Sequence, residues 1–190
     1  MVETKYGKYF LTEPRLKDFK VNPKNAKPRA LMESGTHFGV GNITIEWEAV
    51  LEPYVVDPVP HYHDFDEYIC FLGSNLRGIF DFDAEIELYL GEEGEKHIID
   101  KSTVVYIPKG LVHCPIVYKR IGKPVFFNVI ALKPDYFTAL GKYRTYVIRK
   151  GERDKTIEGM KEIIRQNYSP AYAESLKAFL KELEGKKDIT

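Results

Sequence analysis

Residues 60–73 read PHYHDFDEYICFLG, and this stretch decides the fold and the chemistry that we expect. Side chains at alternate positions of an extended strand share one face, so His61, His63 and Glu67 can point into the same cavity. Imidazole nitrogen and carboxylate oxygen are the donors that suit divalent iron, manganese, nickel, copper or zinc. Three or four such donors on rigid strands leave coordination positions open to water or substrate. The stretch therefore predicts a metal site.

A second stretch, STVVYIPKGLVHCP at residues 102–115, predicts a strand that leads into a Pro-x-Gly turn. Pro108 fixes its own φ angle, and Gly110 permits a backbone conformation that is closed to other residues. Such a turn can aim the next strand and its first histidine, His113, toward the same cavity. His113 is thus the fourth predicted ligand.

The rest of the chain favours an all-β domain with a helical end. From Phe38 onward, short β-branched and aromatic runs are separated by turn residues, which is typical of a sandwich or barrel. The run AEIELYLG at 84–91 alternates, which places Ile86, Leu88 and Leu90 on one face. At 190 residues the chain has room for one compact domain plus an extension.

After about Asp154 the apolar residues recur at helical spacing, which predicts two helices at the C-terminus. Ser169 can cap the second helix, Pro170 can occupy its first position, and Gly185 can end it. The predicted apolar positions are Ile157, Met160, Ile163 and Ile164 in the first helix and Tyr172, Leu176, Phe179, Leu180 and Leu183 in the second. We expect these helices to pack on the outside of the barrel or across a dimer partner.

The two histidine stretches resemble the two conserved motifs of the cupin superfamily. HYHDFDE matches the ligand core of the motif G-x(5)-H-x-H-x(3,4)-E-x(6)-G, and PKGLVH matches that of G-x(5)-P-x-G-x(2)-H-x(3)-N. The departures are that Val55 and Ser102 replace glycines, Gly73 comes one position early, and Val117 replaces the asparagine. None of these positions is a metal ligand in the family's pattern.

The resemblance implies a double-stranded β-helix (jelly-roll) barrel over residues 38–133. The ends lie outside it, and from their sequence pattern we expect an N-terminal arm over 1–37 and a helical extension over 134–190. It also implies that one divalent transition metal (Fe, Mn, Ni or Zn) binds to the four motif residues, which are His61, His63, Glu67 and His113.

Composition limits the partners. Lys plus Arg and Asp plus Glu each total 28, so no net charge attracts nucleic acid or an anionic membrane surface. We therefore expect a small organic ligand or substrate and no nucleic-acid partner. No run approaches the roughly 20 apolar residues of a membrane span, and the N-terminus has no apolar signal core. We expect a cytoplasmic protein, and a homodimer.

The other polar residues of these stretches are assigned to more ordinary roles. His37 and His97 are expected at the surface or on an edge strand, and Asp64 and Asp66 are expected to be solvated or to orient an imidazole. The only cysteines are Cys70 and Cys114. Strand alternation predicts that Cys114 points away from the metal, as a buried structural thiol.

A few residues are candidates to line the pocket or to complete its chemistry. Asn128 is a candidate to replace the missing motif asparagine. The aromatic residues that can line the pocket or fill the core are Trp47, Phe71, Phe126 and Phe127, and the tyrosines that are possible proton donors are Tyr54, Tyr68 and Tyr106.

A metal with open positions in a dry pocket can polarise a carbonyl, activate water or bind dioxygen beside a substrate. We therefore expect a metal-dependent enzyme, either dioxygenase-like or an isomerase or decarboxylase, with dioxygenase chemistry slightly favoured by resemblance to the family's oxygenases. A non-catalytic cupin that senses or sequesters a metal or small ligand is the alternative. A DNA-binding regulator is a weaker third option, because no helix-turn-helix accompanies the barrel.

Overall fold

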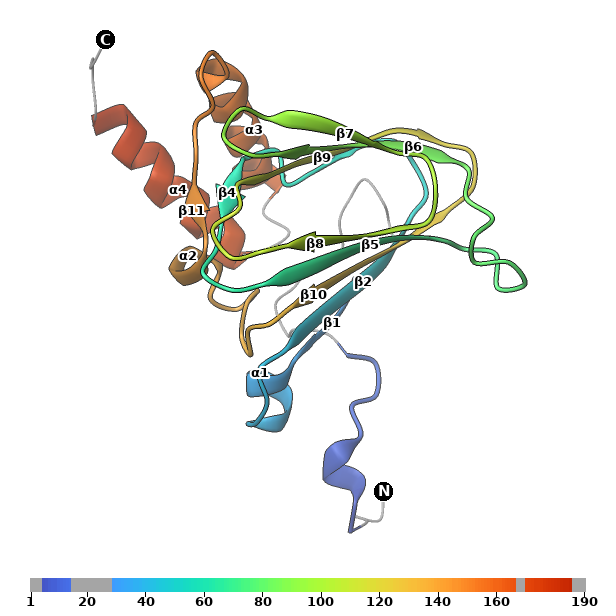
Figure 1. The fold of residues 1–190 in the computed structure, drawn as a ribbon. Coiled ribbons are helices and arrows are strands. Elements are labelled where there is room, and N and C mark those ends of the chain that lie inside the picture. The colour runs from blue at the N-terminus through green and yellow to red at the C-terminus, as the bar shows by residue number, and fades with distance from the viewer. Residues whose placement is uncertain (1–4, 15–28, 167–169, 186–190) are drawn as a thin grey trace.

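The computed structural model of the chain describes residues 5–14, 29–166 and 170–185. Its strands form two antiparallel sheets that face each other, with the C-terminal helices gathered at one end of both (Figure 1). The first sheet has the order β1-β2-β10-β5-β8, and the second has the order β11-β4-β9-β6-β7, with β3 paired to β9. Hydrogen bonds among the described strands therefore build a sandwich of two sheets.

The two sheets and the helices consist of short elements with the following bounds. The first sheet consists of β1 (Ala30–Glu33), β2 (Thr44–Val50), β5 (Glu67–Gly73), β8 (Thr103–Ile107) and β10 (Val125–Ala131). The second consists of β4 (His61–Tyr62), β6 (Ala84–Leu90), β7 (Glu95–Ile99), β9 (His113–Ile121) and β11 (Thr145–Tyr146), with β3 (Val55–Val56) beside it. The helices are η1 (Gly7–Tyr9), α1 (Ser34–Phe38), α2 (Leu140–Tyr143), α3 (Arg153–Gln166) and α4 (Pro170–Gly185).

The inner faces of the sheets form the core, as strand alternation predicts. On β6 the side chains of Ile86 and Leu88 are buried, whereas that of Glu85, on the other face of the strand, is exposed. Phe71 of β5 lies opposite Phe127 of β10 in the register, and both rings are buried between the sheets. The largest part of this core lies away from the helices and consists mainly of Val, Ile, Leu and aromatic side chains.

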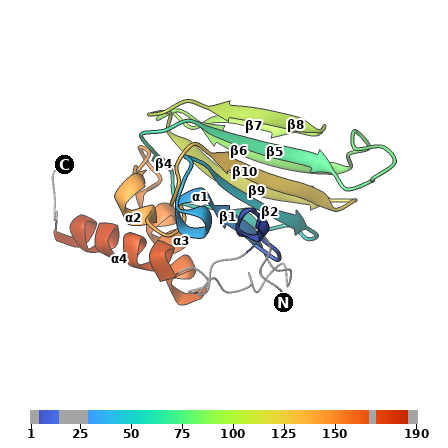
Figure 2. The ribbon, with the colours of Figure 1, turned by 90° about the horizontal axis from the view of Figure 1, so that it is seen from below.

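A second apolar cluster lies at the end of the sandwich where the helices pack (Figure 2). It joins strand and loop residues such as Val59 and Phe65 to Leu140 of α2, Met160 of α3 and Leu176 of α4. The predicted apolar stripes of α3 and α4 are confirmed, since all nine positions are buried in this cluster or packed against it. The helices therefore close one end of the sandwich.

Several expectations about the ends of the chain can be placed. β1 lies inside the range predicted as an arm and pairs with β2 at the edge of the first sheet. The predicted cap at Ser169 lies outside the described residues, whereas α4 begins at Pro170 and ends at Gly185 as predicted. In the described part of the chain, every helix is too short or too polar to cross a bilayer.

Candidate metal centre

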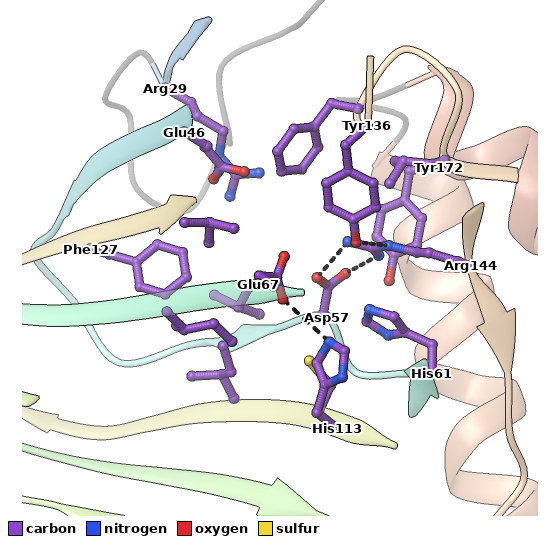
Figure 3. A pocket seen from close by; sticks show the side chains of 17 residues that line it. Arg29, Glu46, Asp57, His61, Glu67, His113, Phe127, Tyr136, Arg144 and Tyr172 are labelled. Carbon is purple, nitrogen blue, oxygen red and sulfur yellow. Dashed lines mark hydrogen bonds and ion pairs between the residues drawn. The ribbon is translucent and has the colours of Figure 1, made fainter. Parts of the chain in front are cut away.

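The four predicted ligands come together at the end of the sandwich that the helices close. His61 lies on β4 and pairs directly with His113, the first residue of β9. Glu67 is the first residue of β5 in the opposite sheet, and His63 lies in the short connection between β4 and β5. All four side chains are buried, at 1–3% exposure. Figure 3 shows His61, Glu67 and His113 pointing into one pocket.

The turn before β9 is built as its sequence predicts. Gly110 has a φ of 82°, and the Leu111 amide donates to the Pro108 carbonyl at 3.1 Å. The Gly110 amide also donates to the His63 carbonyl at 2.8 Å, so the turn is tied to the first histidine stretch. This bond links the two motifs and helps to hold His113 beside them.

Each of the three histidines has its Nδ1 atom on a backbone carbonyl two residues away. His61 Nδ1 lies 3.0 Å from the Val59 oxygen, and His63 Nδ1 lies 2.8 Å from the Phe65 oxygen. The third pair, His113 Nδ1 and the Leu111 oxygen, is 2.9 Å apart. A carbonyl only accepts hydrogen bonds, so the proton of each neutral ring is on Nδ1 and the lone pair is on Nε2. This tautomer is the one that binds a metal through Nε2.

The Nε2 atoms converge on acceptors rather than donors. Nε2 of His63 and of His113 lie 3.3 and 3.5 Å from Oε2 of Glu67. His61 Nε2 is buried and has no hydrogen-bond partner among the residues that the structure describes. Lone pairs and a carboxylate that face one another need a cation between them, and a proton on His63 or a bound metal would supply it. The donor set therefore fits a divalent metal ion.

The protonation states of these groups also suit a metal. Burial lowers the pKa of His113 to about 4 and, helped by the nearby Arg144 charge, holds the pKa of His61 well below its usual value. Burial alone would raise the pKa of Glu67, but its hydrogen bond and charge interaction with His63 outweigh this and leave the pKa lowered. At neutral pH the site thus offers the unprotonated imidazoles of His61 and His113 and the Glu67 carboxylate.

The prediction that Cys114 points away from the site is wrong. The Cys114 thiol is buried, as expected, but its sulfur lies within 4.8 Å of a ring nitrogen of both His61 and His113. The reason is a β-bulge: Leu90 of β6 pairs with His113 and Leu88 pairs with Ile116, so two residues of β9 lie opposite one of β6. Cys114 in the bulge has a φ of 75°, which breaks the alternation and turns its side chain into the pocket.

An ion-pair cluster that the sequence did not indicate forms another wall of the pocket. The Arg144 guanidinium donates to both oxygens of Asp57 at 2.8 and 3.1 Å, and its Nε donates to the Tyr136 hydroxyl at 2.7 Å (Figure 3). The guanidinium also lies over the rings of Tyr136 and Tyr172, at 5.3 and 4.9 Å from their centroids. Burial would raise the pKa of Asp57, but the Arg144 charge outweighs it and holds the pKa below the usual range.

The opposite wall of the pocket carries a second buried charge cluster. Arg29 Nε lies 2.7 Å from Glu46 Oε1, and its Nη2 lies 3.1 Å from Glu48 Oε1. Burial is the main reason that the pKa of Glu46 rises to about 8, with the charge of Glu48 adding to it. Glu46 is therefore mostly protonated at neutral pH, which leaves one guanidinium shared with one carboxylate.

This raised pKa predicts how Glu46→Gln changes stability. Between the unfolded value of 4.5 and the folded value of about 8, the folded state holds a proton that the unfolded state releases. The free energy of unfolding of the wild type should therefore fall as the pH rises through that window. In Glu46→Gln the fall in the free energy of unfolding across this pH window should be smaller by about 1 kcal/mol or more. Urea unfolding at several pH values measures the free energy of unfolding, and an equal fall with pH in both proteins would contradict the prediction.

The pocket between these walls is small and closed by the C-terminal part of the chain. Its volume is about 30 Å³, which is room for one or two waters. Tyr136, Phe137, Leu140, Arg144 and Tyr172 line it, and all five lie in the range 134–190. The helical extension thus contributes directly to the site.

The structure also places the minor candidates near the motifs. Asp64 is mostly solvated, with Lys133 at 3.4 Å, whereas Asp66 accepts a bond from the Lys109 amide in the turn before β9. His97 is half-exposed and lies 3.2 Å from Glu95, and His37 contacts the backbone of Glu33. The two aspartates and two histidines thus lie outside the pocket lining, as expected.

The structure separates the other aromatic and polar candidates. Phe127 lines the pocket and Phe71 fills the core, whereas Phe126 is 38% exposed. Asn128 donates to the Glu46 carbonyl at 2.6 Å and is not among the residues that line the pocket. The proton-donor candidates Tyr54, Tyr68 and Tyr106 and the aromatic Trp47 are also outside the lining.

Comparison with known proteins finds likenesses among solved structures, all at low sequence identity. No family model matches the sequence, and no curated protein does. Among solved structures, the chain is similar to a conserved protein with a double-stranded β-helix domain from Klebsiella pneumoniae, with 11% identity over 62% of this chain and 85% of that one and a TM-score of 0.41.

Two further solved structures are cupins or enzymes by their descriptions. A sugar phosphate isomerase from a cupin superfamily of Silicibacter pomeroyi is 14% identical over 55% of this chain and 59% of its own, with a TM-score of 0.37. A variant of Bacillus subtilis oxalate decarboxylase is 14% identical over 57% of this chain and 26% of its own, with a TM-score of 0.40. The chain thus has two facing antiparallel sheets that bring its two histidine motifs together, which is the arrangement that the sequence predicts for a double-stranded β-helix.

Proposed function

We propose that the protein is a metal-dependent enzyme that acts on a small organic molecule, with one divalent transition metal held by His61, His63, Glu67 and His113. The observation that carries the proposal is the orientation of the three imidazoles. Backbone carbonyls hold all three Nδ1 atoms, so the three Nε2 lone pairs are left free in the buried site, with those of His63 and His113 beside the Glu67 carboxylate. When bound, the metal would supply a Lewis acid for a carbonyl or enolate, or a site for dioxygen.

Tyr136 is the proton donor that the sequence did not reveal. Its hydroxyl oxygen accepts the Arg144 Nε bond at 2.7 Å, which leaves the hydroxyl proton available for a group in the pocket. Its ring lies 5.8 Å from the His63 ring, edge to face, and the side chain is 1% exposed. Burial raises the pKa of Tyr136 well above its usual value, and the positive charge of Arg144 offsets part of this by stabilising the tyrosinate that remains after proton transfer. Arg144 is thus a positioning residue, and Asp57 holds it in place.

The pocket limits the substrate class. Its many polar groups include two guanidinium-carboxylate clusters, and its volume of about 30 Å³ has room for one or two waters, so a substrate must displace lining side chains. We propose small carboxylic acids and enolisable carbonyl compounds, which are compact and polar. Dioxygenase and isomerase or decarboxylase chemistry both remain within this proposal, with dioxygenase chemistry slightly favoured.

Metal removal and reloading test the proposal. The purified protein should contain about one transition metal per chain, and chelation followed by Fe, Mn, Ni or Zn should restore it. Oxygen uptake and product formation are then followed on a panel of such acids and carbonyl compounds, with the metal-free protein as control. A protein that cannot be reloaded would sink the proposal.

Tyr136→Phe separates proton transfer from metal binding. On any substrate that the reloaded wild type converts, turnover should fall by about 100-fold or more, because proton transfer by a positioned group contributes that much. Metal content should stay at the wild-type level, because the phenol is not a ligand. The readouts are turnover against pH and elemental analysis. Unchanged turnover, or metal lost together with activity, would remove Tyr136 from the mechanism.

The alternative is a binding-only cupin that holds a metal or small ligand without turnover. In that case the reloaded protein would bind members of the panel, seen as a rise in melting temperature, and convert none of them. We also propose that the protein is a homodimer and that the barrel is bounded at residues 37/38 and 133/134. Light scattering measures the oligomeric state, and limited proteolysis locates the boundaries.

A further inference from the structure

We infer that Cys114 is a ligand of the metal, so that the centre has a sulfur donor beside its imidazoles and carboxylate. This inference rests on the proposed metal site and changes which metal the site prefers. The cupin motifs contain no cysteine ligand, and strand alternation argues against one here. The geometry is what points to it.

The donor atoms form two overlapping groups of three. The ligand atoms of His63, Glu67 and His113 lie within 4.8 Å of one another, and so do those of His61, His113 and Cys114. His113 belongs to both groups, and its ring centroid lies 4.5 Å from that of His61 and 4.9 Å from that of His63. His61 and His63 are farther apart, at 6.3 Å. The nearest partners of His61 in the site are therefore His113 and the sulfur.

A second observation points to a ligand at this sulfur. His61 is 1% exposed, its Nδ1 is fixed by the Val59 carbonyl, and its Nε2 has no hydrogen-bond partner in the described part of the chain. A buried nitrogen lone pair without a donor costs free energy. A cation bound between His61, His113 and Cys114 would satisfy it.

The backbone around Cys114 supports the same role. The bulge in β9 places two residues opposite one of β6, and Cys114 adopts a φ of 75° there. A left-handed backbone is unfavourable for a residue with a side chain, and bulges often re-aim a side chain at a site. The Arg149 guanidinium donates to the Cys114 carbonyl at 2.7 Å and holds this turn of the backbone. The result is a buried thiol aimed at two imidazoles.

A sulfur ligand changes which metals the site prefers. As the metal binds, the thiol loses its proton to solvent and the thiolate donates a lone pair to the ion. Thiolate favours Zn, Co, Ni or Fe over Mn or Mg, which prefer oxygen donors. The site should therefore select a thiophilic divalent metal.

Cobalt(II) spectroscopy on the full chain tests the inference. The wild type titrated with Co(II) should show visible d–d bands and a near-ultraviolet thiolate-to-cobalt charge-transfer band. Cys114→Ser should keep the d–d bands and lose the charge-transfer band. Cys70→Ser is the matched control, because Cys70 is the other of the two cysteines and is not in the pocket lining. It should leave both bands unchanged.

The other outcomes are also decisive. The d–d bands without a charge-transfer band in the wild type would overturn the sulfur ligand and leave the proposed metal site intact. No cobalt bands at all would overturn both. If Cys114→Ser does not fold, X-ray absorption of the zinc-loaded wild type replaces it. A sulfur atom at about 2.3 Å from zinc supports the inference, and a shell of nitrogen and oxygen alone overturns it.

Discussion

Replacing both His61 and His113 with alanine should abolish metal loading and leave the sandwich folded. The two residues pair across β4 and β9, and His113 belongs to both groups of converging donors. Losing only a hydrogen-bond partner that orients a ligand typically costs about 10-fold to 100-fold in metal affinity, so loss of two ligands should reduce the metal content from about one ion per chain to trace levels. Elemental analysis after dialysis measures this directly.

A second variant tests the same site with little change in shape. Glu67→Gln removes the carboxylate charge of the site and keeps the side-chain volume, so it should also lower the metal content. Circular dichroism and the urea midpoint of the metal-free proteins show whether the sandwich persists. Wild-type metal content in the folded double variant would mean that the ligands have been chosen wrongly.

Replacing Arg144 with alanine should produce the largest loss of stability among single changes near the pocket. The Arg144 side chain is 4% exposed and makes two bonds to Asp57, one to Tyr136 and ring contacts to Tyr136 and Tyr172. Removing it leaves the charge of Asp57, whose side chain is 19% exposed, without its guanidinium partner. Breaking such a pair costs about 3–5 kcal/mol, and urea unfolding of the metal-free protein measures this cost.

A double-mutant cycle separates the ion pair from the packing of the long side chain. The cycle consists of Asp57→Asn, Arg144→Met and the double variant, which removes both charges and keeps most of the volume, so the double variant should be more stable than Arg144→Met alone. The pKa of Asp57 is lowered in the folded state, so its contribution is present above the unfolded value of 3.8 and is lost as the pH falls toward the folded value. The wild type should therefore lose stability in acid more steeply than the double variant. A loss below about 1 kcal/mol in Arg144→Ala would match an exposed pair and contradict the prediction.

The sequence alone determined the strand pattern and the four converging side chains. The expectation that His61, His63 and Glu67 share one face of a single strand is wrong, because His61 lies on β4, Glu67 lies on β5 of the opposite sheet, and His63 lies in the connection between them. His113 follows a Pro-x-Gly turn whose backbone is specified by its own residues, and Gly110 adopts the expected positive φ. The turn signal is local, so it can be read without knowing which strands pair, whereas the meeting of His61 with Glu67 depends on how the two sheets face each other.

The tertiary structure decided everything that depends on register or on distant parts of the chain. The Asp57–Arg144 pair joins residues 87 positions apart, and Arg29 joins Glu46 across two paired strands. Tyr136 reaches the pocket because α2 and α4 close the end of the sandwich. Cys114 faces the histidines because β9 bulges against β6, and a bulge is a property of the pairing of two strands. Local alternation specifies a face only while the register is regular, and it cannot specify partners that the chain brings together from far apart.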